Sequence, residues 1–395
     1  MASNFFAIGL MSGTSMDSVD AALIETDGKD FVRFIDSFEI SYDESFKKSL
    51  KEVEAIISSQ EGVFKKDQQL KNEPKTIDDI LLESTNYHLM AIEGLLKRQK
   101  VMTESFIIGY HGQTFYHQPL KKVSVILGYP KILSDYFKQP VVFNFRENDI
   151  LNGGRGAPLA PIYHYTLAKM DNFIPSVIAN CGGISNITFI SSCNMLDVVA
   201  FDVGPGNTLL DRFITIKTEG RYSFDENGYF SSKGIVDKSV MDILWKKSLK
   251  DEAFYLNAPP KSLDVNDFIL PDEVLKLSVY DGAKTLAAFT ADVLARSVLL
   301  LKPYPKIFIG GGGGFFNPTI MNELKIRLID RIPVFTADEV KWRTKSLEAE
   351  LFAYLAVRSS LKLPLSFPNT TGVPYPLGGG DLYSSRIEMD RNTVC

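Results

Sequence analysis

An apolar run at 5–10 and alternating apolar and polar residues at 19–24 and 31–41 predict three strands near the start of the chain. The segment 9–20, Gly-Leu-Met-Ser-Gly-Thr-Ser-Met-Asp-Ser-Val-Asp, is rich in small and hydroxyl-bearing residues and lacks lysine. It predicts a hairpin turn with accessible N–H groups and hydroxyls, either an ordinary turn or a concavity that holds an anion. Its carboxylates, Asp17 and Asp20, would repel a bare phosphate but suit one that arrives with Mg²⁺. Neither the Walker pattern nor the dinucleotide fingerprint fits it.

Helical periodicity follows at 43–58 and 76–99, and the polar, charged segment 60–75 between them is typical of a surface loop. Thr76 and Asp79 have the spacing of a capping box, which predicts where the second helix begins. His88 lies on the apolar stripe of that helix, which favours a histidine at the edge of the core over a ligand.

Short apolar runs at 106–109 and 140–143 predict buried strands, and each is followed directly by polar residues. These are Tyr-His-Gly-Gln-Thr at 110–114 and Asn-Phe-Arg-Glu-Asn-Asp at 144–149, the latter leading into a glycine-rich segment at 153–158. Ligands of open α/β sheets bind at strand ends, so both polar segments are candidates for a binding site. A shift of composition near residue 140 suggests a domain boundary.

The second half of the chain repeats the pattern of the first. Strands are predicted at 176–179 and 187–190 around a turn at 180–186, and a further strand at 196–201. This similarity indicates a duplicated domain in which each half offers one turn to a shared ligand; chance similarity of two glycine-rich turns is the alternative.

Two further segments of the second half suggest binding. Asp202 ends the strand at 196–201, and Asn207 is placed to cap a helix at 208–216 whose N-terminus would suit an anion. A strand at 306–309 runs into five consecutive glycines at 310–314. Such a run indicates either a close approach by a flat group, such as a nucleotide base and ribose, or a flexible loop.

Composition narrows the class of protein. The chain has 395 residues, 45% of them hydrophobic and 23% charged, a length that suits two domains. A net charge of -5 and a pI near 5.6 give no electrostatic argument for nucleic acid or an anionic membrane as partner. Three cysteines and no visible signal peptide suggest a cytoplasmic protein, and His111, His117 and Cys181 lack the spacing of a zinc site. We therefore expect a small-molecule partner.

Taken together, these motifs resemble the actin, hexokinase and heat-shock ATPase superfamily, and most closely the family of anhydro-N-acetylmuramic acid kinases. The matching segments include Gly-Leu-Met-Ser-Gly-Thr-Ser-Met-Asp, His-Gly-Gln-Thr and Phe-Asp-Val-Gly-Pro-Gly-Asn. In order along the chain, the matches lie at 9–17, 111–114, 145–149, 153–158, 182–186, 201–207, 259–262 and 310–318. Each is weak alone, but the ordered set is specific.

The resemblance implies an α/β fold of two actin-like ATPase (ribonuclease H-like) domains with a nucleotide cleft between them and closure during turnover. The expected domains are 1–139, joined by the tail 370–395, and 140–369. The implied enzyme uses ATP and Mg²⁺, opens a 1,6-anhydro sugar with water and phosphorylates the freed 6-oxygen, in the recycling of peptidoglycan. A homodimer is possible on this basis.

The resemblance also implies roles for single residues. Asp202 matches the catalytic base of the family, and His111, Arg146 and Glu348 are candidates for sugar binding, with Glu348 equally interpretable as a solvated first-turn glutamate. Asp17 is the candidate for Mg²⁺ bound with ATP. The residues assigned to nucleotide binding are Gly13, Thr14, Ser15, Met16, Asp17, Ser18, Val19, Asp20, Gly182, Gly183, Gly204, Gly206, Asn207, Gly311 and Gly312.

Some positions depart from the family pattern: Ser18, Tyr129, Asn144 and the segment 263–266. They bear on sugar preference and ATP affinity. Two alternatives therefore stand beside the main interpretation, a kinase of another anhydro sugar such as levoglucosan and a non-catalytic nucleotide or sugar sensor.

Overall fold

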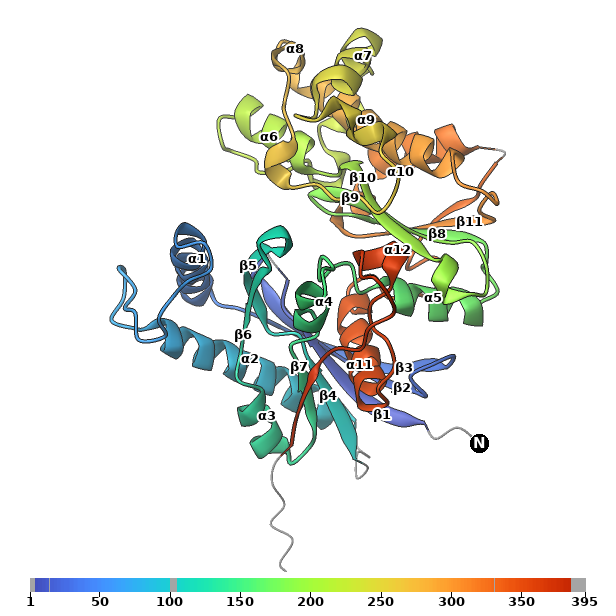
Figure 1. Cartoon of the computed structure of the whole chain (residues 1–395). Coiled ribbons are helices and arrows are strands. Elements are labelled where there is room, and N and C mark those ends of the chain that lie inside the picture. The colour runs from blue at the N-terminus through green and yellow to red at the C-terminus, as the bar shows by residue number, and fades with distance from the viewer. Residues whose placement is uncertain (1–3, 14, 100–104, 330, 385–395) are drawn as a thin grey trace, which may run out of the picture. The chain divides into compact units, whose positions relative to one another are not determined.

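The computed structural model describes residues 4–13, 15–99, 105–329 and 331–384 (Figure 1). Contacts between Cα atoms divide the chain into two units. Unit 1 consists of Met1–Thr166 and Lys345–Cys395, and unit 2 of Leu167–Thr344. Each unit is built around its own mixed sheet.

The sheet of unit 1 has the order β13-β7-β4-β1-β2-β3. Strands β1, β2 and β3 form an antiparallel meander, and β4 and β7 continue the sheet in parallel with β1. The strands predicted near residues 5–10, 19–24, 31–41, 106–109 and 140–143 are therefore confirmed. The bounds are β1 Phe5–Met11, β2 Ser18–Thr26, β3 Val32–Ser41, β4 Phe106–Tyr110, β7 Val141–Phe143 and β13 Asp381–Tyr383.

Helix α11 (Leu347–Ser360) packs on β1, β2 and β4, and two glycines let it come close. Gly9 and Gly109 are direct neighbours across the parallel pair β1 and β4. A Cβ at Gly9 would lie 1.8 Å from the carbonyl oxygen of Ala349, and one at Gly109 would lie 2.0 Å from that of Phe352. The backbone of α11 thus touches the sheet, which fixes the residues at its N-terminal end relative to β1.

The opposite face of this sheet packs on α1 (Glu44–Ser59) and α2 (Ile77–Arg98), because Ile8 and Leu10 alternate with Gly9 and lie in one core cluster with residues of both helices. The predicted capping box forms: Thr76 accepts from the Asp79 amide and the Asp79 side chain accepts from that of Thr76. His88 is fully buried, and burial lowers its pKa to about 4. It is a neutral core residue, as expected.

Unit 2 repeats the order of five of the six strands of unit 1, all except the edge strand β13. Its sheet is β10-β9-β8-β11-β12, in which β8, β9 and β10 form an antiparallel meander and β11 and β12 run parallel to β8. The same order and directions in both units confirm the expected α/β fold of two ribonuclease H-like domains, and they support the duplication. The bounds are β8 Ser176–Cys181, β9 Ile184–Ile190, β10 Val199–Pro205, β11 Ile307–Gly311 and β12 Val334–Thr336.

Helix α9 (Val279–Leu299) is the central helix of unit 2 and contacts α6, α7, α10 and β10. Small residues such as Ala283, Ala287 and Ala291 are fully buried along it, which allows this close packing. The helices around it are α6 Thr208–Lys217, α7 Lys238–Lys247, α8 Asp272–Leu275 and α10 Pro318–Leu328.

Several elements had no clear sequence signal. A hairpin of β5 (Gln113–Gln118) and β6 (Val123–Leu127) follows β4 directly. Residues 196 and 197, predicted to start a strand, belong instead to a 3₁₀ turn, Met195–Asp197, in which the side chain of Asn194 accepts from the Leu196 amide. The remaining helices are α3 Pro130–Phe137, α4 Glu147–Leu151, α5 Pro161–Met170 and α12 Pro368–Thr371.

The two units meet in the sequence at 166/167 and 344/345, whereas the predicted boundaries are 139/140 and 369/370. Residue 140 directly precedes β7, which lies between β4 and β13 inside the sheet of unit 1. Helix α11 packs on the same sheet and also belongs to unit 1. The composition shift near 140 therefore marks a buried strand and not the end of a domain. Among the described residues, no helix is both long and apolar enough to cross a membrane.

Candidate active site

Residues 12–17 connect β1 and β2 in unit 1; we call them the N-terminal turn. The amide of Met16 donates to the carbonyl of Gly13 at 3.1 Å, which closes the turn. Met16 has a positive φ of 56°, unusual for a residue with a side chain, and that side chain is buried in the core. The burial of the Met16 side chain in the core therefore holds the turn against the sheet of unit 1. Thr14 lies outside the described residues.

The predicted binding range 13–20 extends beyond this turn. Ser18, Val19 and Asp20 belong to β2, where they pair with Ser41, Ile40 and Glu39. The side chains of Met16 and Val19 face the core, so they are not available to a ligand. Among the described residues of the turn, Ser15 and Asp17 are exposed, and Gly13 is half-buried, with the Ser15 hydroxyl 3.7 Å from where a Cβ would stand.

Two carboxylates accompany the N-terminal turn. The carboxylate of Asp17 lies 3.6 Å from the ammonium of Lys47, an ion pair in which Asp17 is largely exposed. Burial, together with the neighbouring carboxylates of Glu39 and Glu348 and against the opposing charge of Lys345, raises the pKa of Asp20 to about 6. Asp20 is therefore only partly charged near pH 6.

His111 and Arg146 lie together at the ends of β4 and β7, as expected from their segments. Arg146 donates to the His111 Nε2 atom, at 3.3 Å from Nε and 3.2 Å from Nη2, and to the Gly156 carbonyl at 2.8 Å from Nη1. Since Nε2 accepts, the Nδ1 atom of His111 carries the proton and faces the carbonyl of Gly112 at 2.9 Å. Burial and the charge of Arg146 hold the pKa of His111 well below its usual value, so this histidine is neutral.

No carboxylate within the described parts of the chain forms an ion pair with Arg146. Burial lowers the pKa of its guanidinium, while the charges of Glu348 and Asp149 oppose that effect. Glu348 stands in the first turn of α11 and its side chain is exposed. Protein atoms around its carboxylate replace part of the surrounding water, which raises its pKa, and the charge of Arg146 opposes this shift. A guanidinium with neutral partners is a receptor for an anion.

In unit 2, β8 and β9 are joined by Gly182 and Gly183 alone, which we call the glycine turn. Its carbonyls accept hydrogen bonds from the start of α6. Gly206 and Thr208 donate to Gly183 at 2.9 and 3.3 Å, and Asn207 donates to Gly182 at 2.8 Å. A Cβ at Gly206 would lie 2.2 Å from the carbonyl oxygen of Gly182. The two backbone segments are therefore interlocked.

This interlock changes two expectations for α6. The amides of Asn207 and Thr208, expected to face an anion, donate to the glycine turn instead. Asn207 adopts helical dihedral angles and makes no side-chain cap, so its predicted capping role is wrong. Its side chain lies instead near Gly313 and Gly314, where an added Cβ would stand 4.0 Å and 3.0 Å from it.

Close packing explains part of the glycine run 310–314. A Cβ at Gly310 would meet the ring of Phe315 at 2.9 Å, one at Gly312 would meet Asn180 Oδ1 at 2.2 Å, and one at Gly314 would meet Cys181 Sγ at 2.2 Å. By contrast, an added Cβ at Gly311 would have no neighbour nearer than 3.9 Å. Three of the five glycines therefore admit neighbouring protein groups, and not a nucleotide base and ribose.

Asp202 lies in β10 at an irregularity of the pairing with β9. Its amide donates to the carbonyl of Lys261 at 3.0 Å, and its Oδ2 atom accepts from the amide of Leu263 at 2.8 Å. The segment 259–263 thus fixes the carboxylate from outside the sheet. Because Leu263 contributes its backbone amide, the departure from the family pattern at this position leaves the contact possible for any residue except proline.

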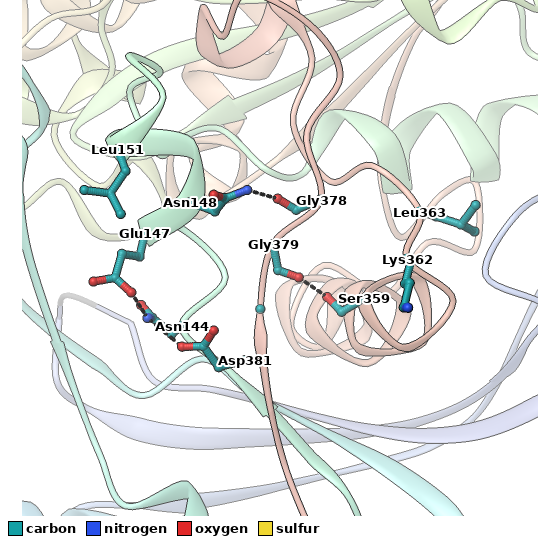
Figure 2. A pocket seen from close by; sticks show the side chains of 11 residues that line it. Asn144, Glu147, Asn148, Leu151, Ser359, Lys362, Leu363, Gly378, Gly379 and Asp381 are labelled. Atoms are coloured by element: carbon teal, nitrogen blue, oxygen red, sulfur yellow. Dashed lines mark hydrogen bonds between the residues drawn. The ribbon is translucent and has the colours of Figure 1, made fainter.

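A cavity elsewhere in unit 1 contains none of the predicted site residues in its lining. It measures about 400 Å³ and is bordered by the start of α4, the end of α11 and residues 378–381 (Figure 2). Asn144 donates there to the carboxylates of Asp381, at 3.0 Å, and Glu147. In the part of the chain that the structure describes, no group of three or more His, Cys, Asp or Glu is arranged to hold a metal ion.

The model of the anhydro-N-acetylmuramic acid kinase family matches residues 5–384. The anhydro-N-acetylmuramic acid kinase of Zymomonas mobilis is 37% identical over 95% of this chain and 99% of its own length. That of Nitrobacter winogradskyi is 39% identical over 95% and 98%. The chain belongs to the anhydro-N-acetylmuramic acid kinase family. It is thus a kinase, and the resemblance inferred from its ordered motifs is confirmed.

Solved structures are more distant. Component A of the (R)-2-hydroxyglutaryl-CoA dehydratase of Acidaminococcus fermentans is 10% identical with a TM-score of 0.43, covering 89% of this chain and 99% of that chain. A ROK family glucokinase of Streptomyces griseus is 14% identical with a TM-score of 0.37, covering 88% and 97%. At these scores the likeness adds nothing to the family assignment.

Proposed function

We propose that this member of the anhydro-N-acetylmuramic acid kinase family cleaves the 1,6-anhydro bridge of 1,6-anhydro-N-acetylmuramic acid with water and phosphorylates the freed 6-oxygen from ATP. The product is N-acetylmuramic acid 6-phosphate, and the reaction serves the recycling of peptidoglycan. The observation that carries the proposal is the carboxylate of Asp202, held by the amide of Leu263 in a chain that matches the family over nearly its whole length.

Asp202 acts as the general base. A 1,6-anhydro sugar has no free 6-hydroxyl, so its internal acetal must open before or while the phosphoryl group is transferred. The carboxylate accepts a proton from water as the water oxygen attacks the anomeric carbon. The bond from that carbon to the bridge oxygen breaks, and this oxygen takes the γ-phosphoryl group of ATP, which leaves ADP.

Arg146 recognises the substrate in unit 1. The lactyl group of a muramic acid carries a carboxylate, and the guanidinium of Arg146 is bound by the neutral acceptors His111 and Gly156. A charged hydrogen bond to that carboxylate would compensate the desolvation that lowers the pKa of Arg146. Levoglucosan lacks the lactyl group, so this contact favours the muramic acid as substrate.

The N-terminal turn receives phosphate groups of ATP. Gly13 and Ser15 offer a backbone and a hydroxyl without bulky neighbours. Asp17 stands beside them and suits Mg²⁺ that arrives with the nucleotide, since this ion keeps several waters and takes few protein ligands. In unit 2, Gly311 is the candidate for a contact with the nucleotide, since an added Cβ there would have no neighbour nearer than 3.9 Å, whereas Gly182, Gly183 and Gly206 form the interlocked backbone of the glycine turn and the start of α6.

The test measures release of ADP in a coupled assay, with 1,6-anhydro-N-acetylmuramic acid, with levoglucosan and with neither sugar. We expect stimulation by the muramic acid derivative and little by levoglucosan. Asp202→Asn keeps an acceptor for the Leu263 amide but loses the base, so turnover should fall at least about 1,000-fold while ATP binding persists. Stimulation by levoglucosan alone would indicate a different anhydro-sugar kinase, and stimulation by neither sugar would indicate a sensor.

A further inference from the structure

A buried chain of side-chain hydrogen bonds lies beneath the N-terminal turn. The Tyr42 hydroxyl donates to Ser12 Oγ at 2.9 Å, and the Ser12 hydroxyl donates to Gln113 Oε1 at 2.7 Å. The Nε2 atom of Gln113 then donates to the carbonyl of Gly13 at 3.2 Å. The three side chains are 3%, 2% and 0% exposed, so solvent cannot replace a lost partner without cost.

The turn is held at both ends, by this side-chain series at its start and by a backbone hydrogen bond at its end. Gln113 binds the carbonyl of Gly13 at its start, and the backbone amide of Tyr42 donates to the carbonyl of Asp17, at 2.9 Å, at its end. Residues from three places in the sequence therefore converge on one short loop. Between the two attachments lie the hydroxyl and carboxylate that face solvent, Ser15 and Asp17.

The direction of the hydrogen bonds is fixed along the whole chain. The Ser12 hydroxyl accepts from Tyr42 and donates to Gln113, so the Gln113 amide has one orientation, with its oxygen toward Ser12 and its nitrogen toward Gly13. Burial raises the pKa of Tyr42 to about 12, which keeps its hydroxyl a donor at neutral pH. Loss of the Tyr42 hydroxyl therefore leaves the buried Ser12 Oγ atom without its donor.

We propose that Tyr42 and Gln113 are positioning residues for the nucleotide: they hold the N-terminal turn in the shape that receives the phosphates of Mg-ATP without themselves touching them. The inference rests on the proposed function of this turn. It predicts that loss of the Tyr42 hydroxyl weakens ATP binding selectively and leaves sugar binding unchanged.

The test compares Tyr42→Phe with Tyr87→Phe. The Tyr87 ring packs on Tyr42 in the same aromatic cluster, at 4.8 Å between ring centroids, but its hydroxyl donates to the exposed carboxylate of Asp43. Each variant loses one phenolic hydroxyl, and Tyr87→Phe leaves the turn intact. For Tyr42→Phe we expect the KM for ATP to rise about fivefold, with the KM for the sugar, kcat and the melting temperature near those of the control.

Two further variants test the chain itself. Gln113→Glu keeps the acceptor for Ser12 but sets a carboxylate oxygen against the Gly13 carbonyl, so the KM for ATP should rise at least about tenfold. Ser12→Ala breaks the chain at its middle, so adding Tyr42→Phe to it should have little further effect. An ATP KM for Tyr42→Phe equal to that of Tyr87→Phe would overturn the proposal. Equal changes in both KM values together with a lower melting temperature would do so too, because they indicate a general loss of structure.

Displacement of a fluorescent ATP analogue, measured without sugar, separates this inference from the proposed function. If the unsubstituted chain binds Mg-ATP but does not turn over the anhydro sugar, the proposed reaction fails while the comparison of Tyr42→Phe with Tyr87→Phe still decides the positioning role. If the unsubstituted chain does not bind Mg-ATP, both fail.

Discussion

The N-terminal turn of unit 1 and the glycine turn of unit 2 occupy the same place, between the first and second strands, in two sheets that share the order of five strands. They are stabilised in different ways. The N-terminal turn depends on side chains, with Met16 buried below it and Ser12 and Gln113 bonded beneath it. The glycine turn depends on backbone hydrogen bonds between its two carbonyls and the start of α6.

This difference separates what each turn can offer to a ligand. A turn held from below by side chains keeps its outer hydroxyls and N–H groups accessible. A turn whose carbonyls accept from the next helix instead uses the amides of that helix, so those amides are lost to an anion. Equal topology therefore does not imply equal binding chemistry, and the two turns should respond differently to substitution.

The largest effect on this comparison is expected from Gly206→Ala, which inserts a methyl group 2.2 Å from the carbonyl oxygen of Gly182. Neither backbone can yield cheaply, so we expect unit 2 to lose about 3 kcal/mol of stability. Both tryptophans of the chain, Trp245 and Trp342, lie in unit 2, so tryptophan fluorescence during urea unfolding reports on this unit.

Gly182→Ala is the matched control for that variant. A Cβ there would have its nearest neighbour at 3.9 Å, and we expect a change below about 1 kcal/mol. Equal midpoints for the two alanine variants would contradict the interlock of the glycine turn with α6.

A somewhat smaller effect is expected from Met16→Ala in unit 1. Removal of this buried side chain leaves a cavity under the N-terminal turn and should destabilise unit 1 by about 2–3 kcal/mol. Met16→Leu conserves volume and should cost less than about 1.5 kcal/mol. Far-UV circular dichroism during urea unfolding measures both, and identical curves for the two variants would show that the turn needs no apolar anchor.

The smallest effect concerns pH and Asp20 beside the N-terminal turn. Its pKa is about 6 in the folded chain against 3.8 for the free residue, so between these values the folded chain binds a proton that the unfolded chain has released. Stability therefore falls as pH rises from about 4 to about 6, by about 1 kcal/mol once solvent screening of this partly exposed group is allowed for. Asp20→Asn should lack this pH-dependent loss of stability, because asparagine does not titrate.

Asp211→Asn in α6 of unit 2 provides the comparison, because burial and the neighbouring Asp225 raise the pKa of Asp211 to about 7. Wild type should therefore lose stability through Asp211 as the pH rises to about 7, and Asp211→Asn should lack this loss. Melting temperatures measured from pH 4 to pH 8 distinguish the two substitutions, and parallel curves for wild type and Asp20→Asn would contradict the raised pKa.

Much of the fold could be predicted from local patterns. The capping box of Thr76 and Asp79, the strand periodicity around the N-terminal turn and the similarity of the two halves all depend on residues close in sequence. The domain boundary could not be predicted in this way. Apolar residues at 140–143 indicate a buried strand, but not which sheet it joins.

The contacts that hold the candidate site were also beyond local patterns. Gly9 starts a glycine- and serine-rich segment, and nothing nearby shows that it must admit the backbone of α11. Likewise, Leu263 supports Asp202 through an amide that every residue except proline possesses. Tyr42 carried no sequence signal at all, because its partner Ser12 is distant in sequence and belongs to another element.

The sequence by itself determined the central strands and the first two long helices, the polar turns at strand ends and, through its ordered motifs, the family, because short-range sterics and burial periodicity depend on neighbouring residues. Only the tertiary structure decided which glycines serve packing, which amides are already bonded and which side chains hold the N-terminal turn. These depend on pairs of groups brought together by the strand order, and that order joins residues far apart in the chain.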